Sequence, residues 1–256
     1  MKIAVAGKGG VGKTIVSAMM VRKLIEYGKG PILVIDADPN ANLNILLGVN
    51  YTRTVSDIVE EFKTRTSRGV SKVDILKMEF QDILVEEEHF DLVVMGAPEG
   101  PGCYCAVNDI LREIVKQFAK NYPYVIFDAE AGLEHLSRKT AGEIDLLILV
   151  SEPNVSSLNT LLKVKEIINH IGLKVNQYLY VINKIRREPA SYIQDFIFKN
   201  QLLPFLTLPF SQTLLQLYER GDDIFEFWDG NFMEKFDIII KEKILKMGVG
   251  NEEYHG

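Results

Sequence analysis

A glycine-rich stretch near the N-terminus has the residue types and spacing of a phosphate-binding loop. Residues Gly7–Thr14 follow the pattern G-x-x-x-x-G-K-[ST], in which glycines let backbone N–H groups approach phosphate oxygens closely. Lys13 is placed for the β- and γ-phosphates of a nucleotide, and the Thr14 hydroxyl is placed for Mg²⁺. The apolar run 3–6 precedes the loop and an apolar-periodic segment, 15–27, follows it. We therefore expect a turn between a strand and a helix whose positive dipole end faces the anion.

Carboxylates follow two other apolar runs. The run 31–35 ends in Asp36-Ala37-Asp38-Pro39, and the run 124–127 ends at Asp128. Two carboxylates at one strand end, such as Asp36 and Asp38, often serve only as a helix cap or in a turn. Beside a phosphate loop, however, a carboxylate can orient the attacking water or hold the hydration shell of Mg²⁺. Asp128 is a candidate ligand to a Mg²⁺-bound water, because Mg²⁺ keeps several waters and takes few direct carboxylates.

Two cysteines lie two positions apart in a Gly/Pro-rich loop. Cys103 and Cys105 belong to the stretch Gly100-Pro101-Gly102-Cys103-Tyr104-Cys105, and free cysteines are often merely small buried hydrophobes. In such a loop they are better suited as soft metal ligands. One chain supplies two sulfurs where a closed tetrahedral site needs four, and a two-fold dimer would supply the rest. We expect metal to bind weakly to the monomer and strongly to the dimer.

The remaining pattern predicts the elements that position these residues. Further apolar runs at 91–95, 146–150 and 178–182 alternate with helical patterns at 107–119, 158–170 and 189–200. Continuous apolar strands separated by helices indicate a mostly parallel sheet flanked by helices, with ligands at the carboxyl ends of the strands. We predict one α/β domain over residues 1–256, with an irregular helical insertion at 50–90.

Composition limits the function classes. The chain has 256 residues, of which 47% are hydrophobic and 25% charged, and its formal net charge is −6. An acidic chain disfavours nucleic acid as a partner. No apolar run approaches the roughly 18 residues of a membrane helix, and no signal peptide precedes the first strand. We expect a cytoplasmic protein without a nucleic-acid or membrane partner.

Lys8 distinguishes this loop from the general phosphate-loop pattern, which does not require a lysine at that position. The stretch K-G-G-V-G-K-T resembles the deviant Walker A sequence of the dimeric ATPases related to ParA, MinD, the nitrogenase iron protein and the CooC-type nickel ATPases. Together with G-C-Y-C at 102–105, D-A-D-P at 36–39, E-A-G-L-E-H-L at 130–136 and V-I-N-K at 181–184, the chain resembles the CooC group. That group assists nickel insertion into carbon monoxide dehydrogenase, and similar proteins serve acetyl-CoA synthase.

The resemblance implies an ATP-hydrolysing metallochaperone that forms a homodimer on binding ATP or metal. It implies a P-loop NTPase fold, ATP and Mg²⁺ as cofactors, and Ni²⁺ as cargo, with Zn²⁺ possible in vitro. The catalytic residues would be Lys8, acting on the partner's nucleotide, Lys13 and Asp38. Magnesium would be held by Thr14, Asp38 and Asp128, and nickel by Cys103 and Cys105. Nucleotide would contact Gly9, Gly10, Val11, Gly12, Lys13, Thr14, Ile15, Asn183, Lys184, Pro209 and Phe210.

Rival functions and departures from the family pattern remain. An iron–sulfur ATPase like the nitrogenase iron protein would need a second cysteine near 130–138, where this sequence has none. A positioning ATPase like MinD or ParA would need a basic surface or an amphipathic membrane helix. Ile15 replaces a hydroxyl that could contact the α-phosphate, and Ala129 follows Asp128 where Thr or Met is common, so we expect hydrolysis to survive with altered nucleotide affinity.

Overall fold

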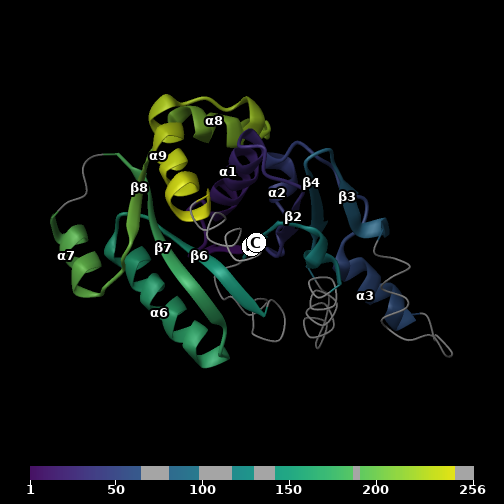
Figure 1. The fold of residues 1–256 in the computed structure, drawn as a ribbon, viewed down its shortest axis with the longest axis horizontal. Helices are drawn as coiled ribbons and strands as arrows, with labels where there is room; N and C mark the ends of the chain where they lie inside the picture. Colours follow the sequence, from purple (N-terminus) through teal and green to yellow (C-terminus); the bar gives the residue numbers. More distant parts are fainter. Residues whose placement is uncertain (65–80, 98–116, 130–141, 187–190, 246–256) are drawn as a thin grey trace, which may run out of the picture.

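An eight-stranded sheet organises the chain. The computed structural model describes residues 1–64, 81–97, 117–129, 142–186 and 191–245 (Figure 1). The strand order is β3-β4-β2-β5-β1-β6-β7-β8, and every neighbouring pair is parallel except β3 with β4. The strands are β1 (Lys2–Gly7), β2 (Ile32–Asp36), β3 (Leu84–Glu86), β4 (Phe90–Val94), β5 (Tyr124–Asp128), β6 (Glu143–Ser151), β7 (Lys174–Ile185) and β8 (Phe205–Pro209).

Helices cover both faces of this sheet (Figure 1). Alternate residues of β1 enter two separate apolar clusters, because successive side chains of a strand point to opposite faces. Ala4 and Ala6 belong to the cluster that contains residues of α3, α6 and α7. Ile3 and Val5 belong to the cluster that contains residues of α1, α2, α8 and α9. The helical elements are α1 (Lys13–Glu26), α2 (Leu43–Leu46), α3 (Val55–Thr64), η1 (Ala119–Asn121), α6 (Val155–Ile171), α7 (Ser191–Lys199), α8 (Gln212–Arg220), η3 (Ile224–Glu226), α9 (Gly230–Ile240) and the π-helical turn η4 (Lys241–Leu245).

The start of α1 differs from the starts of α6, α8 and α9. The N-cap side chains Asn154, Ser211 and Asp229 accept a hydrogen bond from the first turn of α6, α8 and α9. In α1 the N-cap is Gly12, which has no side chain to do so. The first N–H groups of a helix need acceptors. Those of α1 are therefore available to an anion.

The predicted α/β fold with a mostly parallel sheet is confirmed. Strands β6 and β7 begin earlier than the apolar runs 146–150 and 178–182, because polar residues extend them at the amino edge of the sheet. The region 50–90 holds the expected helix α3 but also β3, an antiparallel edge strand that was not foreseen. The helical pattern 107–119 lies almost wholly outside the described residues. In the described ranges, no helix is long and apolar enough to span a membrane.

Arg22 joins α1 to the segment after α8. Its side chain is buried, at 8% exposure, and Nη1 donates to the carbonyl oxygens of Ile224 at 2.7 Å and Phe227 at 2.6 Å. Nε donates to Glu26 Oε1 at 2.7 Å. The guanidinium therefore links α1 to two backbone carbonyls of this segment, of which Ile224 O also accepts from the Phe227 N–H at 3.2 Å.

Replacing Arg22 should destabilise the fold strongly. Arg22→Met leaves the Phe227 carbonyl without this donor and the Ile224 carbonyl with only the Phe227 N–H at 3.2 Å. We expect the free energy of unfolding to fall by about 2–4 kcal/mol, measured by urea denaturation without nucleotide. The matched control is Arg220→Met, because Arg220 pairs with Asp222 at the surface and should contribute less than about 1 kcal/mol. Equal losses in the two variants would contradict the assignment.

Candidate functional site

The phosphate loop is fixed by its neighbours on two strands. Gly7 has φ +153°, and a Cβ there would lie 2.2 Å from the carbonyl oxygen of Val150 in β6. Gly12 has φ +96°, and a Cβ there would lie 2.5 Å from Nδ2 of Asn183 in β7. Both backbone angles are ones that side chains disfavour. Glycine is therefore required at each end of the loop.

A cavity of about 370 Å³ opens beside this loop, at the carboxyl edge of the sheet. Its volume lies within the range typical of small-molecule sites. With the exception of Val11, every residue that the sequence assigned to nucleotide contact lines this cavity: Gly9, Gly10, Gly12, Lys13, Thr14, Ile15, Asn183, Lys184, Pro209 and Phe210. Asp38 also lines it. Val11 is buried and takes part through its carbonyl oxygen.

Sequence reasoning missed part of the cavity wall. The additional lining residues are Asn40, Asn42, Ser211, Leu214, Leu215, Tyr218 and Phe232. Leu214, Leu215 and Tyr218 lie on one face of α8, at the spacing of an amphipathic helix. That periodicity could have revealed the apolar face of this helix. It could not have shown that this face lies beside the phosphate loop, which is about 200 positions earlier in the chain. The lining thus combines the cationic and hydroxyl groups of the loop with an apolar wall suited to a flat base.

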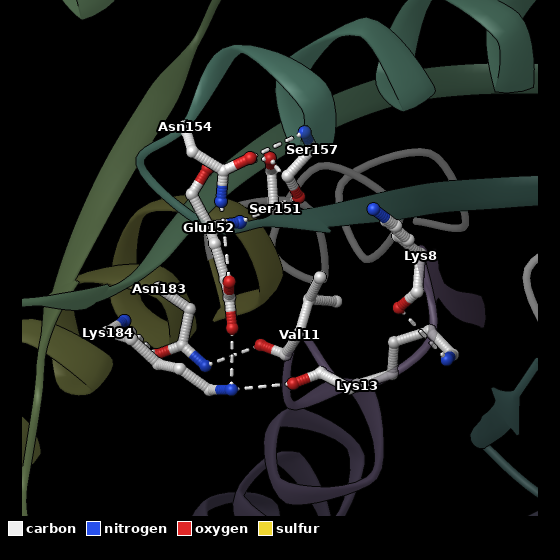
Figure 2. A network of polar contacts seen from close by, with 10 residues as sticks. Lys8, Val11, Lys13, Ser151, Glu152, Asn154, Ser157, Asn183 and Lys184 are labelled. Carbon is white, nitrogen blue, oxygen red and sulfur yellow. Dashed lines mark hydrogen bonds and ion pairs between the residues drawn. The ribbon is translucent and has the colours of Figure 1, made fainter.

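Asn183 and Lys184 bind the outer side of the phosphate loop (Figure 2). Asn183 Nδ2 donates to the carbonyl oxygen of Val11 at 2.9 Å, and Lys184 Nζ donates to that of Gly10 at 2.6 Å. Asn183 Oδ1 accepts from the Lys184 backbone N–H at 2.9 Å. The Asn183 amide therefore has one N–H left for a base, so the contact implied by the resemblance would have to share this side chain with the loop.

The two loop lysines differ in how they are held. Lys13 is buried, and its Nζ lies 3.5 Å from the carbonyl oxygen of Lys8. Lys8 itself is exposed, and its Nζ donates to Ser156 Oγ at 3.4 Å, a long hydrogen bond. Lys8 does not line the cavity. Within one chain it therefore points away from the nucleotide position, toward the start of α6 (Figure 2).

Two carboxylates are buried beneath the cavity. Asp128 accepts from Ser17 Oγ at 2.9 Å through Oδ1, while its buried Oδ2 has no hydrogen-bond donor among the described residues. Burial raises the pKa of Asp128 to about 6, although hydrogen bonds from Thr14 and Ser17 oppose the shift. Burial, and then repulsion from Asp128, raise the pKa of Asp36 to about 7. A nearby cation would relieve both carboxylates.

Asp36 and Asp38 differ in role. Asp36 is fully buried and accepts from the backbone N–H groups of Asp38 and Leu43, each at 3.1 Å, so it shapes the loop after β2. Asp38 lines the cavity and accepts from Asn40 through the backbone N–H and Nδ2. The hard oxygen ligands at Thr14, Asp38 and Asp128 fit Mg²⁺ held partly through water.

The predicted metal ligands Cys103 and Cys105 lie outside the described residues, as do 130–136. Within the described ranges, no group of three or more His, Cys, Asp or Glu side chains is arranged to hold a metal ion.

Comparisons with known proteins agree with this geometry. A family model described as an AAA domain matches residues 1–181. An uncharacterized ATP-binding protein of Methanocaldococcus jannaschii is 38% identical over 96% of this chain and 98% of its own length. The carbon monoxide dehydrogenase accessory protein CooC of Rhodospirillum rubrum is 34% identical over 72% of this chain and 74% of its own. The septum site-determining protein MinD of Pyrococcus horikoshii, solved with Mg-ADP, shares the fold with a TM-score of 0.69 at 21% identity, covering 97% of each chain.

The buried carboxyl of Asp128 should make stability depend on pH. Its pKa in the folded chain, about 6, exceeds the unfolded value of 3.8, so between these values the folded chain binds more protons than the unfolded chain. The free energy of unfolding should therefore fall as pH rises from about 4 to about 6. Asp128→Asn removes this contribution and also lessens the repulsion on Asp36. The free energy of unfolding of the variant should therefore fall less over this pH range than that of the wild type. Urea denaturation without nucleotide or Mg²⁺ measures this, and identical pH profiles would exclude it.

Proposed function

This chain belongs to the AAA-domain family of P-loop ATPases that includes the MinD and ParA proteins, and we propose that it is an ATP-driven nickel chaperone. It would bind nickel at Cys103 and Cys105 of a dimer and assist insertion of the metal into carbon monoxide dehydrogenase or acetyl-CoA synthase. The observation that supports the ATP-dependent part of this proposal is that one cavity is lined by the phosphate loop, by Asp38 and by the ends of β7 and β8.

In the proposed reaction the loop N–H groups and Lys13 bind the β- and γ-phosphates. Mg²⁺, held by Thr14 and through water by Asp38 and Asp128, would neutralise charge on those phosphates. Asp38 orients a water that attacks the γ-phosphorus, the bond from that phosphorus to the bridging oxygen breaks, and ADP and phosphate leave. The apolar wall from Phe210 and Leu214 holds the base.

The cargo assignment is supported by two observations. The chain is 34% identical, over 72% of its length, to a carbon monoxide dehydrogenase accessory protein, and it carries two thiols with one residue between them in a Gly/Pro-rich stretch of sequence. Thiolates suit nickel, zinc and iron–sulfur clusters alike. Dimerisation would couple ATP to metal, because two ligands that both prefer the closed dimer shift the same equilibrium.

Lys8 would complete the partner's site. Among the described residues, its side chain makes one hydrogen bond, the long contact to Ser156 Oγ at 3.4 Å, and the side chain is exposed. Such a contact is weak and readily replaced. Lys8 is therefore free to move to a second chain's phosphate, where a cation stabilises the charge of the transition state.

Mixing two inactive variants tests whether Lys8 acts across the dimer. Lys8→Ala and Asp38→Ala should each reduce ATP hydrolysis at least about a hundredfold. If Lys8 acts in trans and Asp38 in cis, a mixed dimer holds one complete site, and the mixture should recover up to about a quarter of wild-type turnover. Failure of the mixture to recover activity, although mixed dimers form, would show that Lys8 acts within its own chain. Lys120→Ala, an exposed change away from the cavity, is the control.

Metal titration tests the cargo. We expect the wild-type dimer to bind nickel with one ion per two chains, and Cys103→Ser with Cys105→Ser to lose that binding while ATP hydrolysis persists. Tyr104→Phe, in the same loop, is the matched control and should bind nickel normally. Stoichiometric nickel binding by the double cysteine variant would overturn the assignment. Broad visible absorption of the anaerobically purified protein would instead identify an iron–sulfur cluster.

A further inference from the structure

We propose that Glu152 and Lys184, together with Asn183, form a clamp that holds the phosphate loop in its nucleotide-binding shape. We call these three residues the loop clamp. Glu152 and Lys184 act in it as positioning residues: Lys184 binds a carbonyl of the loop, and Glu152 holds Lys184 in place. The inference concerns nucleotide binding by an ATPase and is independent of the metal cargo.

The loop clamp contacts two successive carbonyl groups. Lys184 Nζ donates to Gly10 O at 2.6 Å and Asn183 Nδ2 donates to Val11 O at 2.9 Å. A trans peptide is planar, with its C=O and N–H pointing in opposite directions. Holding the Gly10 carbonyl outward therefore turns the N–H of Val11 inward, and holding the Val11 carbonyl outward does the same for the N–H of Gly12. These are N–H groups that a phosphate loop offers to its anion.

The end of β7 is distorted in a way that brings both side chains to the loop. Between Ile182 and Ile185 the strand contains one residue more than the matching stretch of β8, from Thr207 to Pro209. Within this bulge Lys184 has φ +60°. A bulge redirects side chains, and a lysine in the left-handed region is unfavourable on its own. Backbone strain of this kind is characteristic of functional positions.

Glu152 holds Lys184 from the other side. Its Oε1 lies 2.7 Å from Lys184 Nζ, so one ammonium joins the end of β6, the end of β7 and the phosphate loop (Figure 2). The turn that carries Glu152 is itself rigid, because Ser157 Oγ accepts from the Glu152 backbone N–H at 3.0 Å and Asn154 caps α6. Both side chains of the pair are partly exposed, 39% and 34%. An ion pair of this kind adds little to stability, which favours a positioning role.

The clamp predicts a particular pattern of defects. ADP and ATP use the same inward N–H groups for the β-phosphate, so both should bind more weakly to a clamp variant by the same factor. The KM for ATP should rise while kcat changes little, because the interaction lost is equal in the ground and transition states. The alternative is that Lys184 contacts the nucleotide directly. In that case, removing the charge of Glu152 would release Lys184 for the nucleotide, and ADP and ATP would bind more tightly.

The experiment measures ADP dissociation constants and ATPase kinetics for single and double variants. Lys184→Met should weaken ADP binding about tenfold, the loss expected for one charge-assisted hydrogen bond, and Lys184→Arg should restore most of it. Glu152→Gln should weaken binding about twofold to fivefold. The double variant should bind no more weakly than Lys184→Met alone, because Glu152 acts through Lys184.

A matched pair on the same two strands provides the control. Glu143 and Lys174 pair at 2.8 Å at the opposite, amino ends of β6 and β7. Glu143→Gln and Lys174→Met should leave ADP binding unchanged. The proposal is overturned if Lys184→Met binds ADP as the wild type does, if Glu152→Gln binds it more tightly, if the two effects add, or if the control pair weakens binding equally. Glu152→Gln and Lys184→Arg keep the test valid should Lys184→Met fail to fold.

Discussion

The site depends on one constraint: the phosphate loop binds an anion only while its N–H groups point inward. β1 lies between β5 and β6 in the sheet, so the loop begins from a strand buried on both faces. The close approach of Gly7 to Val150 O and of Gly12 to Asn183 fixes its two ends, and the loop clamp fixes the carbonyls between them. The uncapped start of α1 then offers further N–H groups in the same direction. Nucleotide therefore meets donors that are already oriented, which limits the entropy lost on binding.

The same fold confines two carboxylates that would repel each other. Asp36 and Asp128 are partners in the register of β2 and β5, and both are buried at the ends of apolar strands. Parallel register, and not any attraction between them, brings them together. Burial raises the pKa of both carboxyls, and repulsion from Asp128 raises that of Asp36 further, while Asp38 adds to the rise at Asp128. Arrangements of this kind are characteristic of functional sites. A divalent cation near Thr14 would offset the repulsion between Asp36 and Asp128. Binding of Mg²⁺ would therefore stabilise this edge of the sheet.

Local patterns in the sequence were sufficient for the parts of the site that lie next to their strands. The loop, Asp128 and Asn183 each follow an apolar run directly, Asp38 follows one after two residues, and parallel strands bring such ends to one edge. Glu152 also follows a strand, yet nothing in its neighbourhood marks it. Its partner Lys184 lies 32 positions later in the chain, and Lys184 in turn binds the carbonyl of Gly10 near the N-terminus. The wall from Leu214 and Tyr218 was missed for the same reason. β3 was missed because three residues are too few to show a period.

The turn between β6 and α6 relates the two lysines that set this loop apart from a generic phosphate cradle. Lys184 reaches Glu152 at 2.7 Å and Lys8 reaches Ser156 at 3.4 Å, so both side chains end on one rigid segment. The short contacts of Lys184 involve a carboxylate and a carbonyl, and charge-assisted hydrogen bonds are the stronger class. In the part of the chain that the structure describes, the Lys8 side chain has one partner, a hydroxyl at long distance. A lysine held in place can shape its own loop, whereas a weakly held lysine can leave it. This difference in contact strength is consistent with the proposal that Lys8 completes the site of a second chain.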